Sequence, residues 1–146
     1  MTPAPRSTPI EVLLVEDNPD DAALALRALR QAKLRNRVHL ATTGVEALAF
    51  LRREGSHGAA PRPDLILLDL NLPLKDGREV LAEIKRDDGL RQIPLVVVTG
   101  SQVDEDVAQS YRLHANAYVQ KPIDPKRFLE VVNSIGEFWL EIVKLP

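Results

Sequence analysis

Short apolar runs alternate along the chain with longer segments in which apolar residues recur at helical spacing. The runs 10–15, 37–41, 65–68, 95–98 and 117–119 have the length and composition of strands. Two of them, 65–68 and 95–98, are apolar at every position, which is typical of central parallel strands covered by helices on both faces. The pattern therefore predicts five strands, each followed by a helix.

Capping residues mark where several of these helices begin. Asn18 and Asp124 each precede a proline, which places a cap and a first-turn proline at two helix starts. Thr43 and Glu46 have the spacing of a capping box. We expect a surface loop over 55–63, which is rich in glycine and proline. The expected helices cover about 19–33, 43–55, 77–86, 103–113 and 125–143.

Five β-α units in succession predict an α/β fold, a doubly wound parallel sheet with right-handed crossovers. Residues 10–146 are expected to form one domain, and residues 1–9, with three prolines, a flexible N-terminal tail. In open sheets of this kind, ligands bind beyond the carboxyl ends of the strands. The side chains at those ends are therefore the candidates for chemistry.

Composition and charge narrow the function classes. The 146 residues carry 19 basic and 21 acidic side chains, a net charge of −2 that provides no general field for nucleic acid. No apolar run approaches the roughly 18 residues of a membrane-spanning helix, and the N-terminus lacks the apolar core of a signal peptide. The absence of cysteine excludes disulfides, thiolate metal sites and a cysteine nucleophile, and it agrees with a cytoplasmic protein.

Four strand ends bring polar side chains to one edge of the predicted sheet. Glu16 and Asp17 follow the first strand, whereas Asp69, Thr99 and Lys121 follow the third, fourth and fifth. Carboxylates in one crevice repel one another, by roughly 4 kcal/mol for each pair at about 4 Å and an effective dielectric constant of about 20. Lys121 offsets part of this repulsion, and a hard divalent cation such as Mg²⁺ offsets the rest. With no histidine or cysteine beside them, these ligands do not suit zinc or copper.

An aspartate beside a divalent cation can attack phosphorus and carry an acyl phosphate. Asp69 is the candidate nucleophile, Lys121 and the cation hold the equatorial oxygens, and the Thr99 hydroxyl donates to the product. The chain has no glycine-rich phosphate loop and no signal of a nucleotide pocket. The phosphoryl group is therefore expected from a donor protein or a small phosphodonor.

The chain resembles the receiver domains of two-component response regulators, which are CheY-like, over nearly its whole length. The matching residues are Glu16, Asp17, Asp69, Asn71–Leu72–Pro73, Gly77, Thr99, Tyr118 and Lys121–Pro122. The resemblance implies a flavodoxin-like sheet of five strands in the order 2-1-3-4-5, with five helices.

This resemblance also implies roles for the matching residues. A histidine kinase or its phosphotransfer partner phosphorylates Asp69. Mg²⁺ is held by Asp17, Asp69 and the backbone carbonyl of Asn71, and Glu16 assists. Thr99 and Tyr118 move together when the phosphoryl group arrives. The peptide bond before Pro122 is cis.

A narrower resemblance comes from two features near the C-terminus. His114 stands where most receivers have glycine, and the chain ends soon after the segment 138–143, with no output domain expected after it. Both features resemble the stand-alone response regulators of bacterial phytochrome kinases. This resemblance implies a light-sensing histidine kinase as partner and protein contact as the output. His114 also suits a left-handed position at a helix end.

The last expected helix has more apolar positions than one sheet-facing stripe needs. Val131, Phe138 and Leu145 recur at a spacing of seven, and Trp139 lies beside them. Because an exposed apolar stripe usually marks a partner surface, we predict a homodimer through these four residues. The alternative is that the C-terminal turn folds back on its own domain.

Other functions share part of this pattern. An aspartyl-phosphate phosphatase also uses an aspartate nucleophile, but its Asp-x-Asp motif follows the first strand, and here Asn71 takes the second position. A flavin-binding flavodoxin needs a phosphate cradle where this chain has Glu16 and Asp17. A receiver that docks without phosphorylation, and one that only drains phosphate from its kinase, keep the same residues. We expect a phosphoacceptor, not a metabolic enzyme, that catalyses only its own phosphorylation and dephosphorylation.

Overall fold

Five parallel strands form one sheet in the order β2-β1-β3-β4-β5. This architecture comes from a computed structural model that describes residues 9–33, 35–100, 115 and 117–135. The strand order confirms the doubly wound fold expected from the β-α alternation. The strands are β1 (Ile10–Val15), β2 (Asn36–Ala41), β3 (Leu65–Asp69), β4 (Leu95–Thr99) and β5 (Ala117–Gln120).

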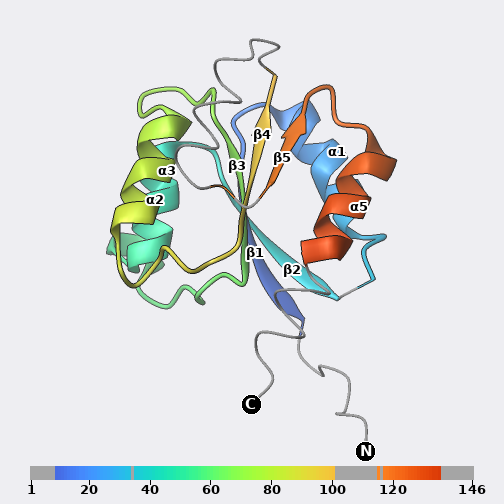
Figure 1. Cartoon of the computed structure of the whole chain (residues 1–146). Coiled ribbons are helices and arrows are strands. Elements are labelled where there is room, and N and C mark those ends of the chain that lie inside the picture. Colours follow the sequence, from blue (N-terminus) through green and yellow to red (C-terminus); the bar gives the residue numbers. More distant parts are fainter. Residues whose placement is uncertain (1–8, 34, 101–114, 116, 136–146) are drawn as a thin grey trace, which may run out of the picture.

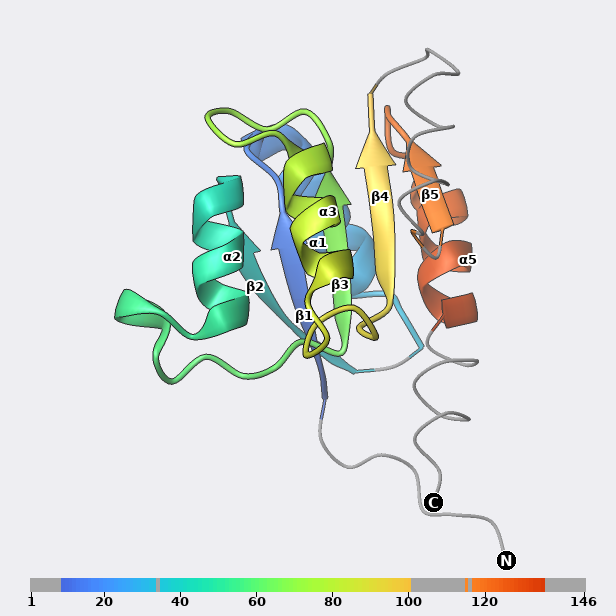
Figure 2. The ribbon, with the colours of Figure 1, turned by 60° about the vertical axis from the view of Figure 1, so that its left-hand side comes forward.

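Helices cover both faces of the sheet. Helices α1 (Pro19–Leu29) and α5 (Pro125–Ile135) lie on one face, and α2 (Gly44–Arg52) and α3 (Gly77–Arg86) lie on the other (Figure 1 and Figure 2). A short 3₁₀ turn, η1 (Gly55–His57), lies in the loop after α2. The helix expected over 103–113 lies outside the described residues, so the total of five helices stays a prediction.

The sheet divides the apolar core into two layers. Alternate residues of β3 pack on opposite faces of the sheet. Leu65 and Leu67 pack in the layer with α1 and α5, and Ile66 and Leu68 pack in the layer with α2 and α3. All residues of β3 and β4 are buried, as their unbroken apolar runs predicted. Because both central strands are fixed from two sides, their carboxyl ends form a rigid edge for a site.

Helix α1 ends at Leu29, before the Lys33 expected from the sequence. The Asn36 side chain donates to the Leu29 carbonyl at 2.8 Å. After the C-cap residue Arg30, the backbone N–H groups of Gln31 and Ala32 donate to the carbonyls three residues before them, at 3.0 and 3.1 Å. These bonds close a tighter turn in place of another α-helical turn.

Helix α2 has the predicted start but ends at Arg52 and not at Gly55. Thr43 Oγ1 accepts from the Glu46 N–H at 3.1 Å, as expected for the capping box. The helix ends because Arg53 adopts the left-handed conformation, with φ 56°.

The structure corrects one residue of the predicted dimer stripe. Val131 is buried in the core of its own domain together with Phe128 and Val132. The stripe of α5 is wide because this helix packs on α1 as well as on β5. Phe138, Trp139 and Leu145 lie outside the described residues, so the homodimer stays a prediction.

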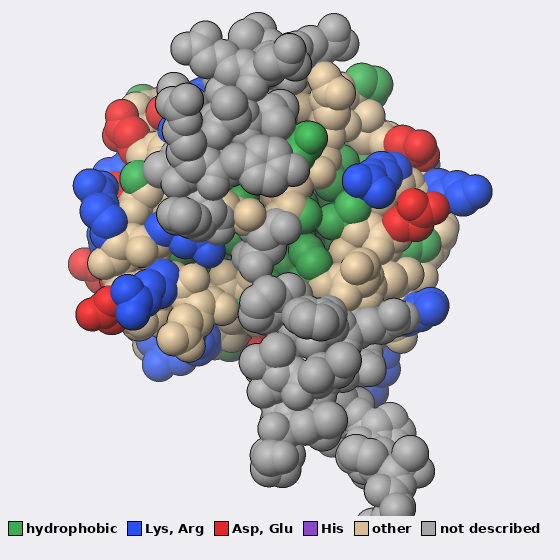
Figure 3. Space-filling model, in the orientation of Figure 1, with side chains coloured by type: hydrophobic (Ala, Val, Ile, Leu, Met, Phe, Trp, Pro, Cys, Tyr) green, Lys and Arg blue, Asp and Glu red, His purple; other side chains and the backbone are tan. Residues whose placement is uncertain are grey.

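Charges of both signs are interspersed on the face shown in Figure 3, in line with the small net charge. Among the residues that the structure describes, no helix is long and apolar enough to cross a membrane.

Leu74, in the loop between β3 and α3, is both strained and exposed. Its φ is 66°, in the left-handed region, and its side chain is 91% exposed. We expect Leu74→Asn to raise the free energy of unfolding by about 0.5–1 kcal/mol, because asparagine adopts this region more readily. Urea unfolding with an unchanged m-value measures the gain.

Leu40→Asn is the matched control for this substitution. Leu40 is also an exposed leucine, but it lies in β2, where asparagine is disfavoured, so this variant is expected to lose stability. If Leu74→Asn were no more stable than the wild type, the strain at Leu74 would be refuted.

Candidate functional site

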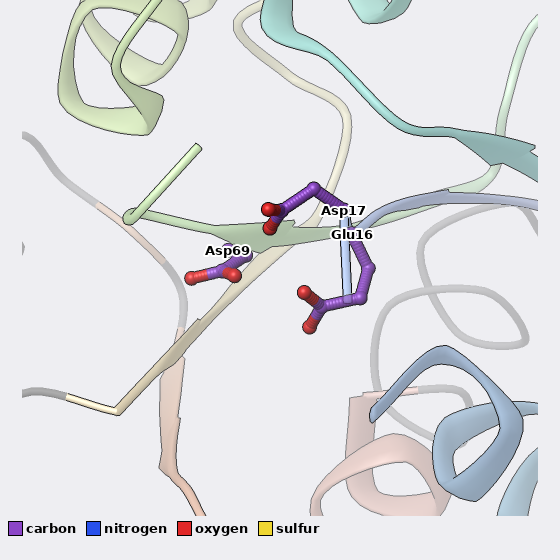
Figure 4. A group of neighbouring side chains, drawn as sticks. All are labelled: Glu16, Asp17 and Asp69. Carbon is purple, nitrogen blue, oxygen red and sulfur yellow. The ribbon is translucent and has the colours of Figure 1, made fainter. Parts of the chain in front are cut away.

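The ends of β1 and β3 bring three carboxylates together. Glu16 and Asp17 follow β1, and Asp69 is the last residue of the neighbouring strand β3. One carboxylate oxygen from each lies within 4.8 Å of the other two, and Figure 4 shows the three side chains pointing toward one another. Glu16 and Asp69 are each 3% exposed, whereas Asp17 is exposed to solvent.

The Lys121 ammonium group reaches into this cluster from the end of β5. Its Nζ lies 2.7 Å from Glu16 Oε1, 2.9 Å from Asp21 Oδ2 and 3.1 Å from Asp69 Oδ2. The Lys121 backbone N–H donates to the Thr99 carbonyl at 2.7 Å, which ties it to the end of β4. The peptide bond before Pro122 is cis, which confirms what the resemblance implied.

The two oxygens of Asp69 are held by different donors. Oδ1 accepts from the Asn71 backbone N–H at 2.9 Å, and Oδ2 accepts from Lys121 Nζ at 3.1 Å. One donor belongs to the loop after β3 and the other to the end of β5. The orientation of the Asp69 carboxylate is therefore set from two sides.

Burial and charge act against each other on the pKa values of the site. Burial raises the pKa of Glu16, Lys121 lowers it and Asp69 raises it further, with a net result of about 7. Burial works to lower the pKa of Lys121, but its bonds to Glu16, Asp21 and Asp69 raise it overall. Lys121 is therefore a permanent cation, whereas Glu16 binds a proton near neutral pH when no other cation balances it.

The raised pKa of Glu16 makes the stability of the metal-free protein depend on pH. Because this pKa exceeds the ordinary 4.5, the folded state binds the proton more tightly than the unfolded state. The stabilisation is complete below about pH 4.5 and is lost as the pH rises through about 7. We expect wild type to lose on the order of 2 kcal/mol over this window relative to Glu16→Gln.

Urea unfolding in EDTA across this pH window measures the effect, and added Mg²⁺ is expected to reduce it. If wild type and Glu16→Gln followed the same pH profile, the assignment of this titration to Glu16 would be wrong.

The donor set of the cluster fits a hard divalent cation. Asp17, Glu16 and Asp69 contribute carboxylate oxygens, and no histidine or cysteine belongs to this group among the described residues. Magnesium takes one or two carboxylates and keeps several waters, and the exposed position of Asp17 leaves room for them. Lys121 supplies only one positive charge against these carboxylates and Asp21. A second cation therefore relieves repulsion that the ion pairs of the described residues leave in place.

The two predicted switch residues lie at different depths. Thr99 is the last residue of β4 and is only 1% exposed. Tyr118 lies in β5 opposite Val97 and is half-buried against the core layer of α2 and α3. Thr99 borders the charged cluster through the Lys121 backbone. His114 lies outside the described residues.

Asp21 is the site residue that the sequence reasoning missed. In the sequence it is a first-turn acid that complements the dipole of α1, and its N–H does donate to the Asn18 cap at 3.1 Å. Its carboxylate also binds Lys121. The sequence offered no signal beyond its place in the first turn of the helix that follows Glu16 and Asp17.

Comparisons with known proteins show which family the chain resembles. The family model for the response regulator receiver domain matches residues 12–133. Response regulator Rcp1 from Synechocystis sp. strain PCC 6803 is 46% identical over 138 residues, which cover 94% of each chain.

Solved structures show the same likeness. The Mn²⁺-bound form of Rcp1 has a TM-score of 0.80 and 46% identity and covers 94% of this chain and 99% of that one. The phosphorylated cyanobacterial phytochrome response regulator RcpA has a TM-score of 0.81 and 47% identity, with 95% and 99% covered. The bacteriophytochrome response regulator RtBRR has a TM-score of 0.80 and 43% identity, with 90% and 81% covered. With the cluster of Glu16, Asp17, Asp69 and Lys121 inside the matched span, the chain belongs to the response regulator receiver domain family.

Proposed function

We propose that this protein is a response regulator of a two-component system and that Asp69 accepts a phosphoryl group from a histidine kinase. The observation that carries the proposal is the position of the Asp69 carboxylate, which is buried at the end of β3 beside both the Lys121 ammonium and the acidic pair that follows β1. One cluster thus holds a nucleophile, a cation for phosphoryl oxygens and ligands for a divalent ion.

In the proposed reaction, an Asp69 oxygen attacks the phosphorus of a phosphohistidine on the kinase. The new P–O bond forms as the P–N bond breaks, and the electron pair leaves with the imidazole, which takes up a proton from solvent. The Asn71 N–H and Lys121 hold the nucleophile in one orientation, which lowers the entropy cost of the attack. The Lys121 ammonium then stabilises charge on the equatorial phosphoryl oxygens.

We propose Mg²⁺ as the resident cation, held by Asp17, Asp69 and the backbone carbonyl of Asn71, with Glu16 assisting. When bound, the ion neutralises charge on the phosphoryl oxygens and on the carboxylates. The all-oxygen donor set supports this proposal. So does the relative Rcp1, of which a Mn²⁺-bound form has been solved.

The proposed signal begins at Thr99. Its hydroxyl donates to a phosphoryl oxygen, and Tyr118 moves with it. The burial of Thr99 beside the Lys121 backbone supports the first step, and the half-buried position of Tyr118 leaves it freedom to change its packing. The output is an altered protein-binding surface around β4 and β5.

The proposed kinase is a phytochrome-type light sensor. The similarity to RcpA, a cyanobacterial phytochrome response regulator, and to RtBRR, a bacteriophytochrome response regulator, supports this partner. The same proposal places the encounter with the kinase in the cytoplasm.

Transfer from a purified kinase tests the proposal. A bacteriophytochrome kinase is first autophosphorylated with labelled ATP and then mixed with this protein in Mg²⁺ or in EDTA. We expect the label to pass to this protein in Mg²⁺ only, and more slowly from a histidine kinase without a phytochrome sensor. Equal transfer from both kinases would contradict the light-sensor pairing. Failure of every phosphodonor, acetyl phosphate included, would contradict the acceptor role itself.

A further inference from the structure

The Lys121 ammonium has a third carboxylate partner that belongs to neither the acidic pair of β1 nor the acceptor aspartate. Asp21 Oδ2 lies 2.9 Å from Lys121 Nζ, a shorter distance than the 3.1 Å to Asp69. An ammonium group has three N–H donors, so Glu16, Asp21 and Asp69 account for all of them.

Asp21 approaches the lysine from a different element of the fold. It lies in the first turn of α1, whereas Glu16 and Asp69 lie at the ends of β1 and β3. Its side chain is 23% exposed, and the two others are 3% exposed. Asp21 is also absent from the group of three carboxylates whose oxygens lie within 4.8 Å of one another. Its carboxylate therefore stands at the rim of the site, where it contacts the Lys121 ammonium.

This position matters because the other two partners change during phosphorylation. One oxygen of Asp69 becomes the bridging oxygen of an acyl phosphate and loses most of its negative charge. Glu16 faces the cation-binding cluster, so a bound divalent ion competes with Lys121 for its charge. Asp21 is neither phosphorylated nor part of that cluster, so its hold on Lys121 persists through the cycle.

We propose that Asp21 is a positioning residue that holds the Lys121 ammonium at the rim, where the phosphoryl oxygens arrive. This inference rests on the proposed function. Asp21 acts through Lys121 and not through the metal. It keeps a flexible side chain within reach of the transferring group, and so it raises the rate of phosphoryl gain.

Asp21→Asn tests the proposal, with Asp20→Asn as the matched control. Both residues are acids in the first turn of α1, and both backbone N–H groups donate to Asn18, so both substitutions remove the same helix-dipole charge. At saturating Mg²⁺, we expect Asp21→Asn to slow labelling by acetyl phosphate about three- to tenfold, the effect of losing one partly exposed charged hydrogen bond. Asp20→Asn is expected to label at the wild-type rate.

Two further readouts separate positioning from a structural effect. In a Lys121→Met background, Asp21→Asn is expected to have no additional effect, as in a double-mutant cycle between coupled residues. The ¹⁹F spectrum of the beryllofluoride adduct, whose fluorines stand in for the phosphoryl oxygens, is expected to shift in Asp21→Asn and not in Asp20→Asn.

Three results would overturn the inference. The first is equal labelling rates for the two variants. The second is a persisting effect of Asp21→Asn without Lys121. The third is a change in Mg²⁺ affinity with a normal rate at saturation. In each of these three results, wild-type Asp69 is still labelled. The proposed function fails in a different way, by giving no label in wild type, so the two failures can be told apart.

Discussion

Asp69→Asn is expected to lower phosphoryl labelling by acetyl phosphate at least about a thousandfold, because it removes the attacking oxygen. The substitution keeps the shape of the side chain and its acceptor for the Asn71 N–H. It also removes one of the charges that raise the pKa of Glu16. A thermal melt checks that the variant is folded, and loss of label in a folded variant reports loss of the nucleophile.

Asp76→Asn is the matched control for this loss. Asp76 lies in the same β3–α3 segment and caps α3 by accepting from the Arg78 N–H at 2.7 Å. Asparagine caps helices equally well, so this variant should label within about twofold of wild type. Mass spectrometry of the labelled peptide locates the phosphoryl group. Label that persists in Asp69→Asn would move the acceptor elsewhere and overturn the central proposal.

Gly77→Ala is expected to lower the free energy of unfolding by about 1–3 kcal/mol and to slow labelling of Asp69, although Gly77 has no chemical group to contribute. A Cβ at this position would lie 2.2 Å from the Asp69 carbonyl oxygen and 2.5 Å from the Leu70 Cα. Both neighbours are backbone atoms, so they cannot rotate away. The Gly77 N–H also donates to the Leu70 carbonyl at 2.9 Å, which draws the start of α3 against the end of β3. Relief of the clash must therefore move Asp69 or Leu70 itself.

Gly58→Ala separates this effect from the general consequence of replacing a glycine. A Cβ on Gly58 would meet only the Gly55 carbonyl oxygen, at 3.8 Å, which is an ordinary contact. We expect that variant to stay within about 0.5 kcal/mol of wild type in urea unfolding and to label normally. If Gly77→Ala matched Gly58→Ala in both stability and labelling, the tight packing of α3 on the acceptor strand would be refuted.

The strand ends could be predicted because each depends on a short stretch of chain. The unbroken apolar runs of β3 and β4 indicated central parallel strands, and the residues that follow such strands must share one edge of the sheet. That reasoning was enough to predict that Asp69 and Lys121, which are 52 residues apart in the sequence, lie close together. The same reasoning could not identify Asp21 as a partner of Lys121, because that contact depends on where α1 packs against the sheet.

Local pattern also misled where tertiary contacts decide an outcome. Val131 has the spacing of an exposed second stripe, yet it is buried because α5 packs on α1 as well as on the sheet. Helix α1 has the periodicity to continue toward Lys33, yet the side chain of Asn36 takes the Leu29 carbonyl and a tighter turn follows. In the first case a helix distant along the chain, and in the second a side chain seven residues further on, prevailed over a weak local preference.

The sequence by itself determined the fold class, the strand order through the family resemblance, and the meeting of Asp69 with Lys121 and the acidic pair, Glu16 and Asp17, at one edge of the sheet. These features follow from side-chain periodicity, capping residues and the geometry of parallel sheets, all of which act over a few residues. The tertiary structure alone decided the third partner of Lys121, the raised pKa of Glu16 and the contact of Gly77 with the Asp69 backbone. Each of these depends on distances of a few ångströms between separate elements, and such distances are set only when the whole core packs.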